Sequence, residues 1–207
     1  MGNVCNTRDP AVKEDREAIE ILRTVHVQRE PGKPVGLDLD FMDGKTARVL
    51  EVLEGAVQTN GVKIRTGDHI VGVNGQRGVP EMMKHLRDDV SLEIELQHPK
   101  EFRVRLKKGD LLGIDYTHAP NGDCLLIRRI LPNGAVCEWN KSTNATPVKP
   151  LDRIIEVNTF RGSWSKILAE IQRADDLAMV VAPFPDPLPA PDAPPLKPVK
   201  PKPVMVG

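Results

Sequence analysis

The chain has 207 residues, enough for one large domain or for two small domains of about 80–100 residues each. Its 29 basic and 29 acidic side chains give a formal net charge of zero, and aromatic residues make up only 3%. This balance gives no general attraction to nucleic acids, and aromatic side chains on which bases stack are scarce. We therefore expect no nucleic acid among the partners.

No stretch of the sequence approaches the ~18–20 apolar residues that span a bilayer, and the N-terminus lacks the apolar core of a signal peptide. The cysteines are Cys5, Cys124 and Cys137, with no C-x-x-C spacing and no histidine at zinc-ligand spacing. We expect free thiols in a reducing compartment, a cytoplasmic location, and neither a metal nor another cofactor.

The N-terminus carries a candidate lipidation signal. Residues 1–8 resemble an N-myristoylation signal in which Gly2 is exposed once Met1 is removed, although Asn6 stands where Ser or Thr is preferred. Cys5 is then a natural palmitoylation site, and stable anchoring needs both acyl chains. We predict lipidation at Gly2 and Cys5 and contact with the cytoplasmic face of a membrane. The alternative is an ordinary disordered segment.

Residues 9–23 predict a short helix. Asp9 is a good N-cap, Pro10 suits the first helical position, and the apolar residues that follow recur on one face. Together with the lipidation signal, this helix forms an N-terminal region, residues 1–23, that precedes the globular body.

The globular body repeats itself. Five short anchors recur in the same order, with an offset that grows from 77 to 87 residues. The paired anchors are 35–39 with 112–116, 55–57 with 134–136, 62–74 with 148–158, 77–78 with 161–162, and 88–90 with 175–177. The second copy has longer loops, and we expect its polar stretch 140–146 to be one of them. The repetition predicts two domains, residues 24–98 and 99–182.

Each copy predicts the same order of elements. In the first copy, strands are predicted over 24–29, 35–41, 46–53, 69–73 and 90–96. Alternation of apolar and polar residues marks 35–41 and 90–96, and the turn signals Asp43-Gly44 and Asn74-Gly75 lie beside 46–53 and 69–73. One helical turn is expected over 55–59 and a longer helix over 79–87. The second copy repeats this order from Phe102 to Ala182.

The anchors resemble the PDZ domain. The first copy carries the family's core motif as Gly67–Gly75, G-D-H-I-V-G-V-N-G, whereas the second has Leu151 and Thr159 in place of the two outer glycines. The resemblance implies an α+β, mostly β fold. It consists of two PDZ-like, partly open β-barrels or sandwiches, each with one main and one short helix.

PDZ domains bind a peptide C-terminus as an added strand, with its carboxylate held by backbone N–H groups of a glycine-containing loop. The resemblance places this loop at Val35, Gly36 and Leu37 in the first copy and at Leu112, Gly113 and Ile114 in the second. Lys33 and Lys108 lie just upstream. They either add positive charge to the site or are solvated loop cations.

The longer helix supplies the other wall of the implied peptide groove, and its apolar residues at positions i, i+4 and i+7 share one face. The groove residues are Leu39, Val79, Met83 and Leu86 in the first copy, and Tyr116, Trp164, Leu168 and Ile171 in the second. Core packing is the alternative role for each helical trio. Because the first helix position is apolar in both copies, the resemblance implies ligands that end in an apolar-x-apolar pattern.

Nothing in the sequence points to an enzyme. The five histidines are scattered, and none lies in a G-x-S-x-G, phosphate-loop or metal-ligand context. Paired aspartates at 88–89 and 175–176 follow the helix in each copy, which favours a solvated loop over acid–base chemistry. We expect no catalytic residues.

Residues 183–207 form a proline-rich tail, expected to be disordered and extended because it has few large apolar residues. Within it, residues 195–200 match the P-x-x-P-x-K pattern that SH3 domains bind, and a plain spacer is the alternative.

The sequence therefore predicts a non-enzymatic scaffold that binds C-terminal or internal peptide segments. The main alternative is a structural membrane tether that acts by PDZ self-association, by analogy with the layout of Golgi reassembly stacking proteins. A regulatory protein whose grooves have lost ligand binding is a third possibility.

Overall fold

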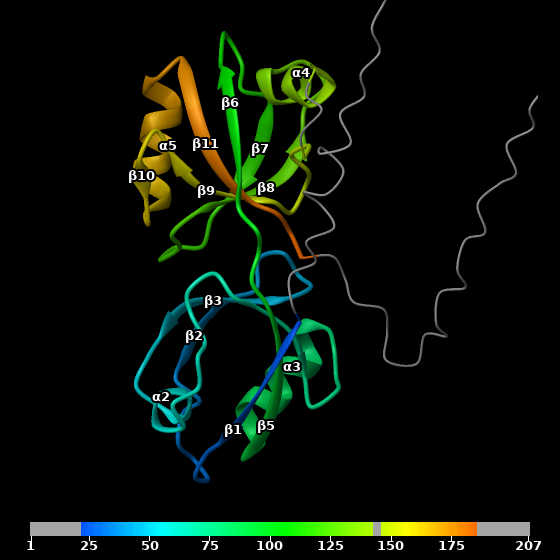
Figure 1. Ribbon diagram of the computed structural model, residues 1–207, viewed down its shortest axis with the longest axis vertical. Coiled ribbons are helices and arrows are strands. Elements are labelled where there is room, and N and C mark those ends of the chain that lie inside the picture. The colour runs from blue at the N-terminus through cyan, green and yellow to red at the C-terminus, as the bar shows by residue number, and fades with distance from the viewer. Residues whose placement is uncertain (1–21, 143–145, 186–207) are drawn as a thin grey trace, which may run out of the picture.

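The computed structural model describes residues 22–142 and 146–185, and these residues form two β-rich units placed one above the other along the long axis (Figure 1). Within them, residues 23–97 form a five-stranded sheet and residues 102–182 a six-stranded sheet, and all neighbouring strands are antiparallel. We call these the first and second unit. The prediction of a mostly β protein with few helices is confirmed.

The first unit contains β1 (Arg23–Gln28), β2 (Leu37–Asp40), β3 (Ala47–Val52), α2 (Ala56–Thr59), β4 (His69–Val73), α3 (Val79–Asp88) and β5 (Ser91–Gln97). Its sheet order is β1-β5-β4-β3-β2, so β2 lies at an edge. Alternation along β5 explains the core, because Leu92, Ile94 and Leu96 are buried while Ser91 and Glu93 are exposed. Each such side chain stabilises the fold by about 1.5–3 kcal/mol.

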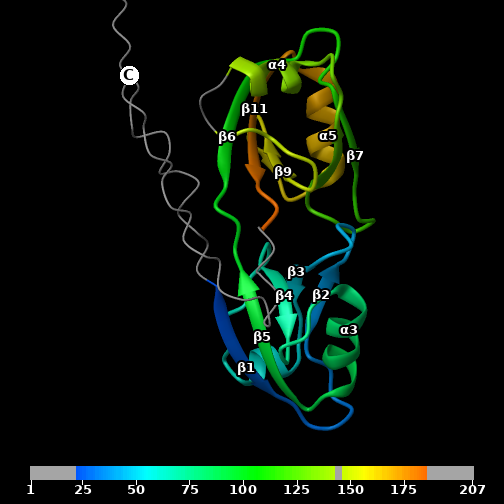
Figure 2. The same ribbon diagram turned by 90° about the vertical axis from the view of Figure 1, so that its right-hand side faces the viewer.

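The second unit repeats this order with β6 (Phe102–Lys107), β7 (Ile114–Thr117), β8 (Leu125–Ile130), α4 (Ala135–Ser142), β9 (Arg153–Val157), β10 (Phe160–Arg161), α5 (Trp164–Arg173) and β11 (Asp176–Ala182). Its order β6-β11-β9-β8-β7 places β7 at the edge that β2 occupies in the first unit, and β10 pairs with β9. Figure 2 shows α3 and α5 on one side of the molecule, opposite β1 and β6.

Three details differ from the sequence-based expectations. Arg23, the last residue of the predicted N-terminal helix, begins β1, and residues 1–21 of that prediction lie outside the described residues. Strand β2 is shorter than expected. Helix α4 extends to Ser142, into the stretch predicted as a loop, because Val136 is buried and Trp139 packs against the core. Among the described residues, no helix has the length and apolar character needed to cross a membrane.

The motif asparagines have the same structural role in both units. Asn74 has φ +50° and Asn158 has φ +46°, a left-handed conformation that asparagine tolerates well. The side-chain oxygen of Asn74 accepts a hydrogen bond from Glu93 N, and that of Asn158 accepts one from Ala178 N, both on the strand that follows the helix. In each unit, the motif asparagine therefore links the turn after the central strand (β4 or β9) to the adjacent strand (β5 or β11).

The turns also keep their geometry where the second unit lacks the motif's glycines. Gly67 and Leu151 have φ +89° and +73°, and Gly75 and Thr159 have φ +71° and +76°. A left-handed conformation costs a residue with a Cβ atom about 1–2 kcal/mol. The second unit thus keeps the same turns at a cost in stability.

The two units meet at a junction of reciprocal ion pairs. Arg48 of β3 donates two hydrogen bonds to Asp123 of the second unit, at 2.7 and 3.0 Å. Arg153 of β9 donates to Asp40 and Asp43 of the first unit, at 2.6 and 3.1 Å. The side chains of both arginines are no more than 3% exposed. Each unit therefore holds the other through a buried guanidinium group.

A third link comes from the chain after β11. The backbone N–H of Phe184 donates to Asp152, and its ring lies edge-on to His69 of the first unit at 6.2 Å between centroids. The Lys45 ammonium group lies 5.6 Å from the centre of the same ring. The start of the proline-rich tail is thus fixed at the junction, and residues 186–207 lie outside the described residues.

His69 is the titratable group at this junction. Burial, reinforced by the charges of Arg153 and Arg48, holds the pKa of His69 well below its usual value near 6.5. The Thr46 hydroxyl donates its hydrogen to Asp43, so it must accept one from His69 Nδ1, 2.8 Å away. Nδ1 of His69 therefore carries a proton, and the lowered pKa favours the neutral imidazole.

We predict that Thr159→Gly stabilises the protein, because glycine adopts φ +76° without the Cβ penalty. The free energy of unfolding should rise by about 0.5–1 kcal/mol, since the greater freedom of glycine in the unfolded chain offsets part of the gain. Gly75→Thr, the reverse change at the matching position, should destabilise by a similar amount. Urea denaturation measures both, and equal stability of all three proteins would contradict the prediction.

We also predict that the junction loses stability in mild acid. The folded-state pKa of His69 is depressed, so its contribution is complete above the unfolded pKa of about 6.5 and is lost as the pH falls toward the folded-state value. The slope approaches about 1.4 kcal/mol per pH unit for one proton. Urea midpoints between pH 8 and pH 5 measure it. His69→Gln should flatten the dependence and the exposed-site control His26→Gln should not; the opposite result would refute the assignment.

Candidate functional site

The carboxylate loop predicted for the first unit is closed against the start of α2. The carbonyl groups of the loop face inward: Pro34 O accepts from Ala56 N, Val35 O from Val57 N and Gly36 O from Leu53 N, at 2.9–3.1 Å. The second unit repeats these three bonds with Leu111, Leu112 and Gly113 as acceptors. Both loops therefore have the same backbone conformation.

A close backbone contact explains the glycines of both loops. A Cβ atom on Gly36 would lie 2.9 Å from Gly55 Cα, and one on Gly113 would lie 2.6 Å from Gly134 Cα. Both loop glycines also have φ near +80°, at +86° and +80°. The two glycine-containing anchors of each repeat thus touch one another, a packing reason for glycine that the sequence analysis did not identify.

The amide groups of the same loops remain available. Among the described residues, no acceptor binds the backbone N–H of Val35 or Gly36, nor that of Leu112 or Gly113. Successive backbone N–H groups next to a left-handed residue form an anion-binding concavity. The loops therefore have donors that suit a carboxylate.

The edge strands offer backbone groups beside these loops. Leu37 lies opposite Val52, and the neighbouring bond from Leu53 N to Gly36 O makes this a non-hydrogen-bonded pair. The N–H and C=O of Leu37 therefore point away from β3, toward the open edge of the sheet. Ile114, opposite Ile130 and next to the bond from Leu131 N to Gly113 O, has the same arrangement in the second unit.

The predicted groove side chains lie on β2, β7 and the two helices. In α3, Met83 is 37% exposed and Leu86 only 6%, while Met82, one residue earlier, is fully buried. Leu39 and Val79 are half-buried and pack against the first core, and Tyr116 packs against the second. In α5, Leu168 is half-buried and Ile171 is buried. Leu86 and Ile171 therefore belong to the core, while Met83 offers an exposed apolar surface.

A basic side chain joins each loop region to the end of the helix. The Lys108 ammonium group donates to the carbonyl oxygens of Ile171 and Gln172, which commits it to the C-terminus of α5. In the first unit, Arg29 donates to Asp89 O, to Arg87 O and to Lys33 O. The sequence indicates Lys33 as the cation of this loop and gives little indication of Arg29. The only signal was its place at the end of the first strand.

The second site differs at the first residue of its helix. The Trp164 ring stacks on His118, with centroids 3.5 Å apart and planes 9° apart, and its N–H donates to Pro120 O at 3.1 Å. His118 directly follows β7, so this contact joins the edge strand to the helix. Val79 occupies the matching position in the first unit with a much smaller side chain. The residue predicted to read a ligand side chain is therefore already engaged within its own unit.

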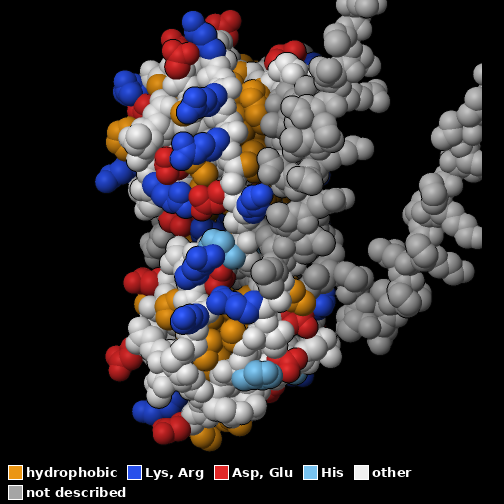
Figure 3. Space-filling view, viewed as in Figure 1, with side chains coloured by type: hydrophobic (Ala, Val, Ile, Leu, Met, Phe, Trp, Pro, Cys, Tyr) orange, Lys and Arg blue, Asp and Glu red, His pale blue; other side chains and the backbone are white. Residues whose placement is uncertain are grey.

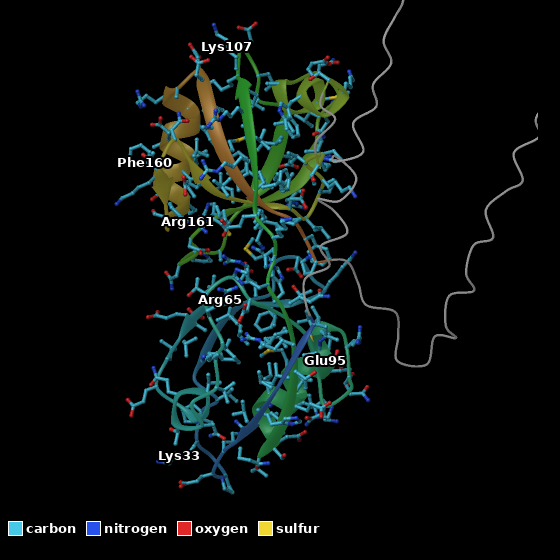
Figure 4. The ribbon with its side chains drawn as sticks, viewed as in Figure 1. Lys33, Arg65, Glu95, Lys107, Phe160 and Arg161 are labelled. Carbon is cyan, nitrogen blue, oxygen red and sulfur yellow. The ribbon has the colours of Figure 1, made fainter. Side chains whose placement is uncertain are left out.

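Both predicted carboxylate loops lie at the outer ends of the molecule. Lys33 lies at the lower end and Lys107 at the upper end, and α2 and α4 mark the same two ends (Figures 1 and 4). The loops that follow β2 and β7 carry Asp43 and Asp123 and lie at the junction. Each edge strand therefore runs from an outer end toward the junction.

Charges of both signs lie among one another on the face shown in Figure 3, as expected for a chain with no net charge. Among the described residues, no group of three or more His, Cys, Asp or Glu side chains is placed to hold a metal ion. Cys124 and Cys137 are free thiols. The predicted lipidation residues Gly2 and Cys5 lie outside the described residues.

No family model and no curated protein matches this chain. Similar solved structures include the INAD PDZ45 tandem in complex with NG2 peptide, at 18% identity and a TM-score of 0.37, covering 85% of this chain and 96% of that one. A complex of INAD PDZ45 with NORPA CC-PBM matches at 16% identity and a TM-score of 0.35, covering 83% and 94%. These values are low, so the description of the fold rests on strand order, register and the repeated contacts above.

Proposed function

We propose that this protein is a PDZ-like scaffold whose first unit binds the C-terminal segment of a partner protein as a strand added along β2. One observation carries the proposal: the outward-facing backbone of Leu37 lies directly beside the available N–H groups of Val35 and Gly36. An extended peptide gains main-chain hydrogen bonds along β2, and its terminal carboxylate gains the loop donors.

Charge and side chains also support a peptide site along β2. Arg29 donates to the backbone carbonyl oxygen of Lys33, which places one guanidinium group beside the chain just upstream of the loop. Met83 supplies exposed apolar surface, and the first helix position holds Val79, which favours an apolar residue in the ligand. We therefore propose ligands that end in an apolar-x-apolar pattern. A peptide array with a clear preference for Ser/Thr at the third-from-last position would contradict this specificity.

The remaining parts of the proposal rest on the sequence alone. They are lipidation at Gly2 and Cys5, with the membrane contact that it implies, and an SH3-type partner for the proline-rich tail. Peptide binding by the first unit does not depend on them.

We predict that Met83→Glu weakens peptide binding at least tenfold. The new carboxylate would face an apolar ligand side chain and would lose water without gaining a partner. Fluorescence anisotropy with a labelled peptide that ends in Val-x-Val measures the affinity. Lys84→Gln, an exposed change on the same helix that also shifts the charge by one unit, should leave the affinity unchanged. Equal affinity of Met83→Glu and wild type would place the site elsewhere.

We predict that the second unit binds peptide only after the contact of Trp164 with the loop that follows β7 is removed. Trp164→Ala removes the stack on His118 and the hydrogen bond to Pro120 O, so α5 and β7 are no longer joined at that point. With the first site blocked by Met83→Glu, the added Trp164→Ala change should produce peptide binding and shift the amide resonances of Ile114 and Tyr116. Trp139→Ala in the same background is the control. Binding by the second unit without the Trp164 change would show that the contact does not close the site.

A further inference from the structure

The junction and the first site share one structural element, the loop that follows β2. We propose that Arg153 of the second unit is a positioning residue for the peptide site of the first unit, acting across the junction through Asp40 and Asp43. The inference rests on the proposed function, because the site it concerns is the one along β2.

Asp40 and Asp43 organise this loop through their side chains. One oxygen of Asp40 accepts the N–H of Met42 at 2.7 Å, and one oxygen of Asp43 accepts those of Lys45 and Thr46 at 2.8 and 2.7 Å. These bonds fix the chain over the whole reversal between β2 and β3. The conformation of the loop therefore depends on where the two carboxylates are held.

Arg153 binds the second oxygen of each carboxylate, and Asp43 Oδ2 also accepts the Thr46 hydroxyl. Its two terminal nitrogens donate to Asp40 Oδ2 at 2.6 Å and to Asp43 Oδ2 at 3.1 Å. The three side chains are no more than 2% exposed, so water does not compete for these bonds. A planar guanidinium group with separate donors can set the spacing of two carboxylates, which an ammonium group cannot do as well.

The position of Asp40 connects this contact to the site. Asp40 is the last residue of β2, three residues after Leu37, whose N–H and C=O face the open edge. A shift of the loop therefore tilts or frays the short edge strand along which the ligand is proposed to lie. β2 has only four residues, so few other hydrogen bonds fix its end.

The second unit contains a corresponding arginine contact. Arg48 of the first unit holds Asp123 in the loop that follows β7, and this loop also carries the His118 and Pro120 contacts to Trp164. In both units, an arginine from the opposite unit thus fixes the loop at the junction end of the edge strand. The repetition supports a role in shaping the sites in addition to holding the units together.

The experiment compares Arg153→Gln with Arg161→Gln in the full chain. Arg161 also pairs with two carboxylates, Glu101 just before β6 and Glu156 of β9, and neither belongs to the first unit. Couplings carried through such networks change affinity by about 2- to 30-fold. We expect Arg153→Gln to weaken binding of the Val-x-Val peptide about tenfold, and Arg161→Gln to leave it unchanged.

Two further variants separate positioning from loss of the fold. Arg153→Lys keeps the charge and should restore part of the affinity. The triple change Arg153→Met, Asp40→Asn and Asp43→Asn leaves no buried unpaired charge, so it should fold and still bind weakly. Amide spectra of each variant report whether Leu37, Asp38 and Leu39 shift while the core resonances of β4 and β5 stay in place.

The outcomes distinguish the two proposals. If wild type binds no peptide from a C-terminal library, the proposed function fails, and the inference fails with it. If wild type binds and Arg153→Gln binds equally well, the function stands and the inference is wrong. The inference is also wrong if the affinity of each variant falls only in proportion to its unfolded fraction, measured by urea denaturation, with the β2 resonances unmoved.

Discussion

Among the described residues, the buried guanidinium groups of Arg48 and Arg153 constrain how the two units are arranged. Moving an ion from water into a protein interior costs several kcal/mol, and good geometry with opposite charges must offset that cost. Each arginine finds its carboxylates in the other unit, so the cost is offset only while the units are in contact. Contact between the units and burial of these charges therefore depend on one another. The loops after β2 and β7, His69 and Phe184 all lie at this contact.

Much of the fold was predictable because local patterns and the internal repeat agreed. The Asn74-Gly75 turn signal located β4 to the residue, alternation located β5 within one residue, and the repeated Asp and Asn residues marked turns that both units share. The departures have physical reasons. Leu151 and Thr159 hold left-handed conformations that sequence preference argues against, because hydrogen bonds on either side fix the turns. Helix α4 extends into a polar stretch because Trp139 packs against the core of the second unit. The sequence alone could not assign Trp139 to a core.

The candidate site was predictable in outline and less so in detail. The glycine loops were found from their motif, but the reason for glycine, contact with a second glycine about 20 residues away, needed coordinates. Helical spacing identified the face with Val79, Met83 and Leu86 without separating the exposed Met83 from the buried Leu86. The stack of Trp164 on His118 joins residues from separate elements, as does the reach of Arg29 to the end of α3. No local pattern encodes such contacts between distant residues.

The placement of the loops at the outer ends has a steric consequence for a scaffold. A peptide added antiparallel to β2 with its carboxylate at the outer loop has its upstream chain directed toward the junction, and a peptide on β7 has the same direction from the other end. The folded domains of two partners would then both lie near the junction, where Phe184 packs. Large partners would compete for that space even though their binding sites do not overlap, whereas partners with long flexible tails would not. Under the proposed function, this geometry would favour partners with a long segment before their C-terminus.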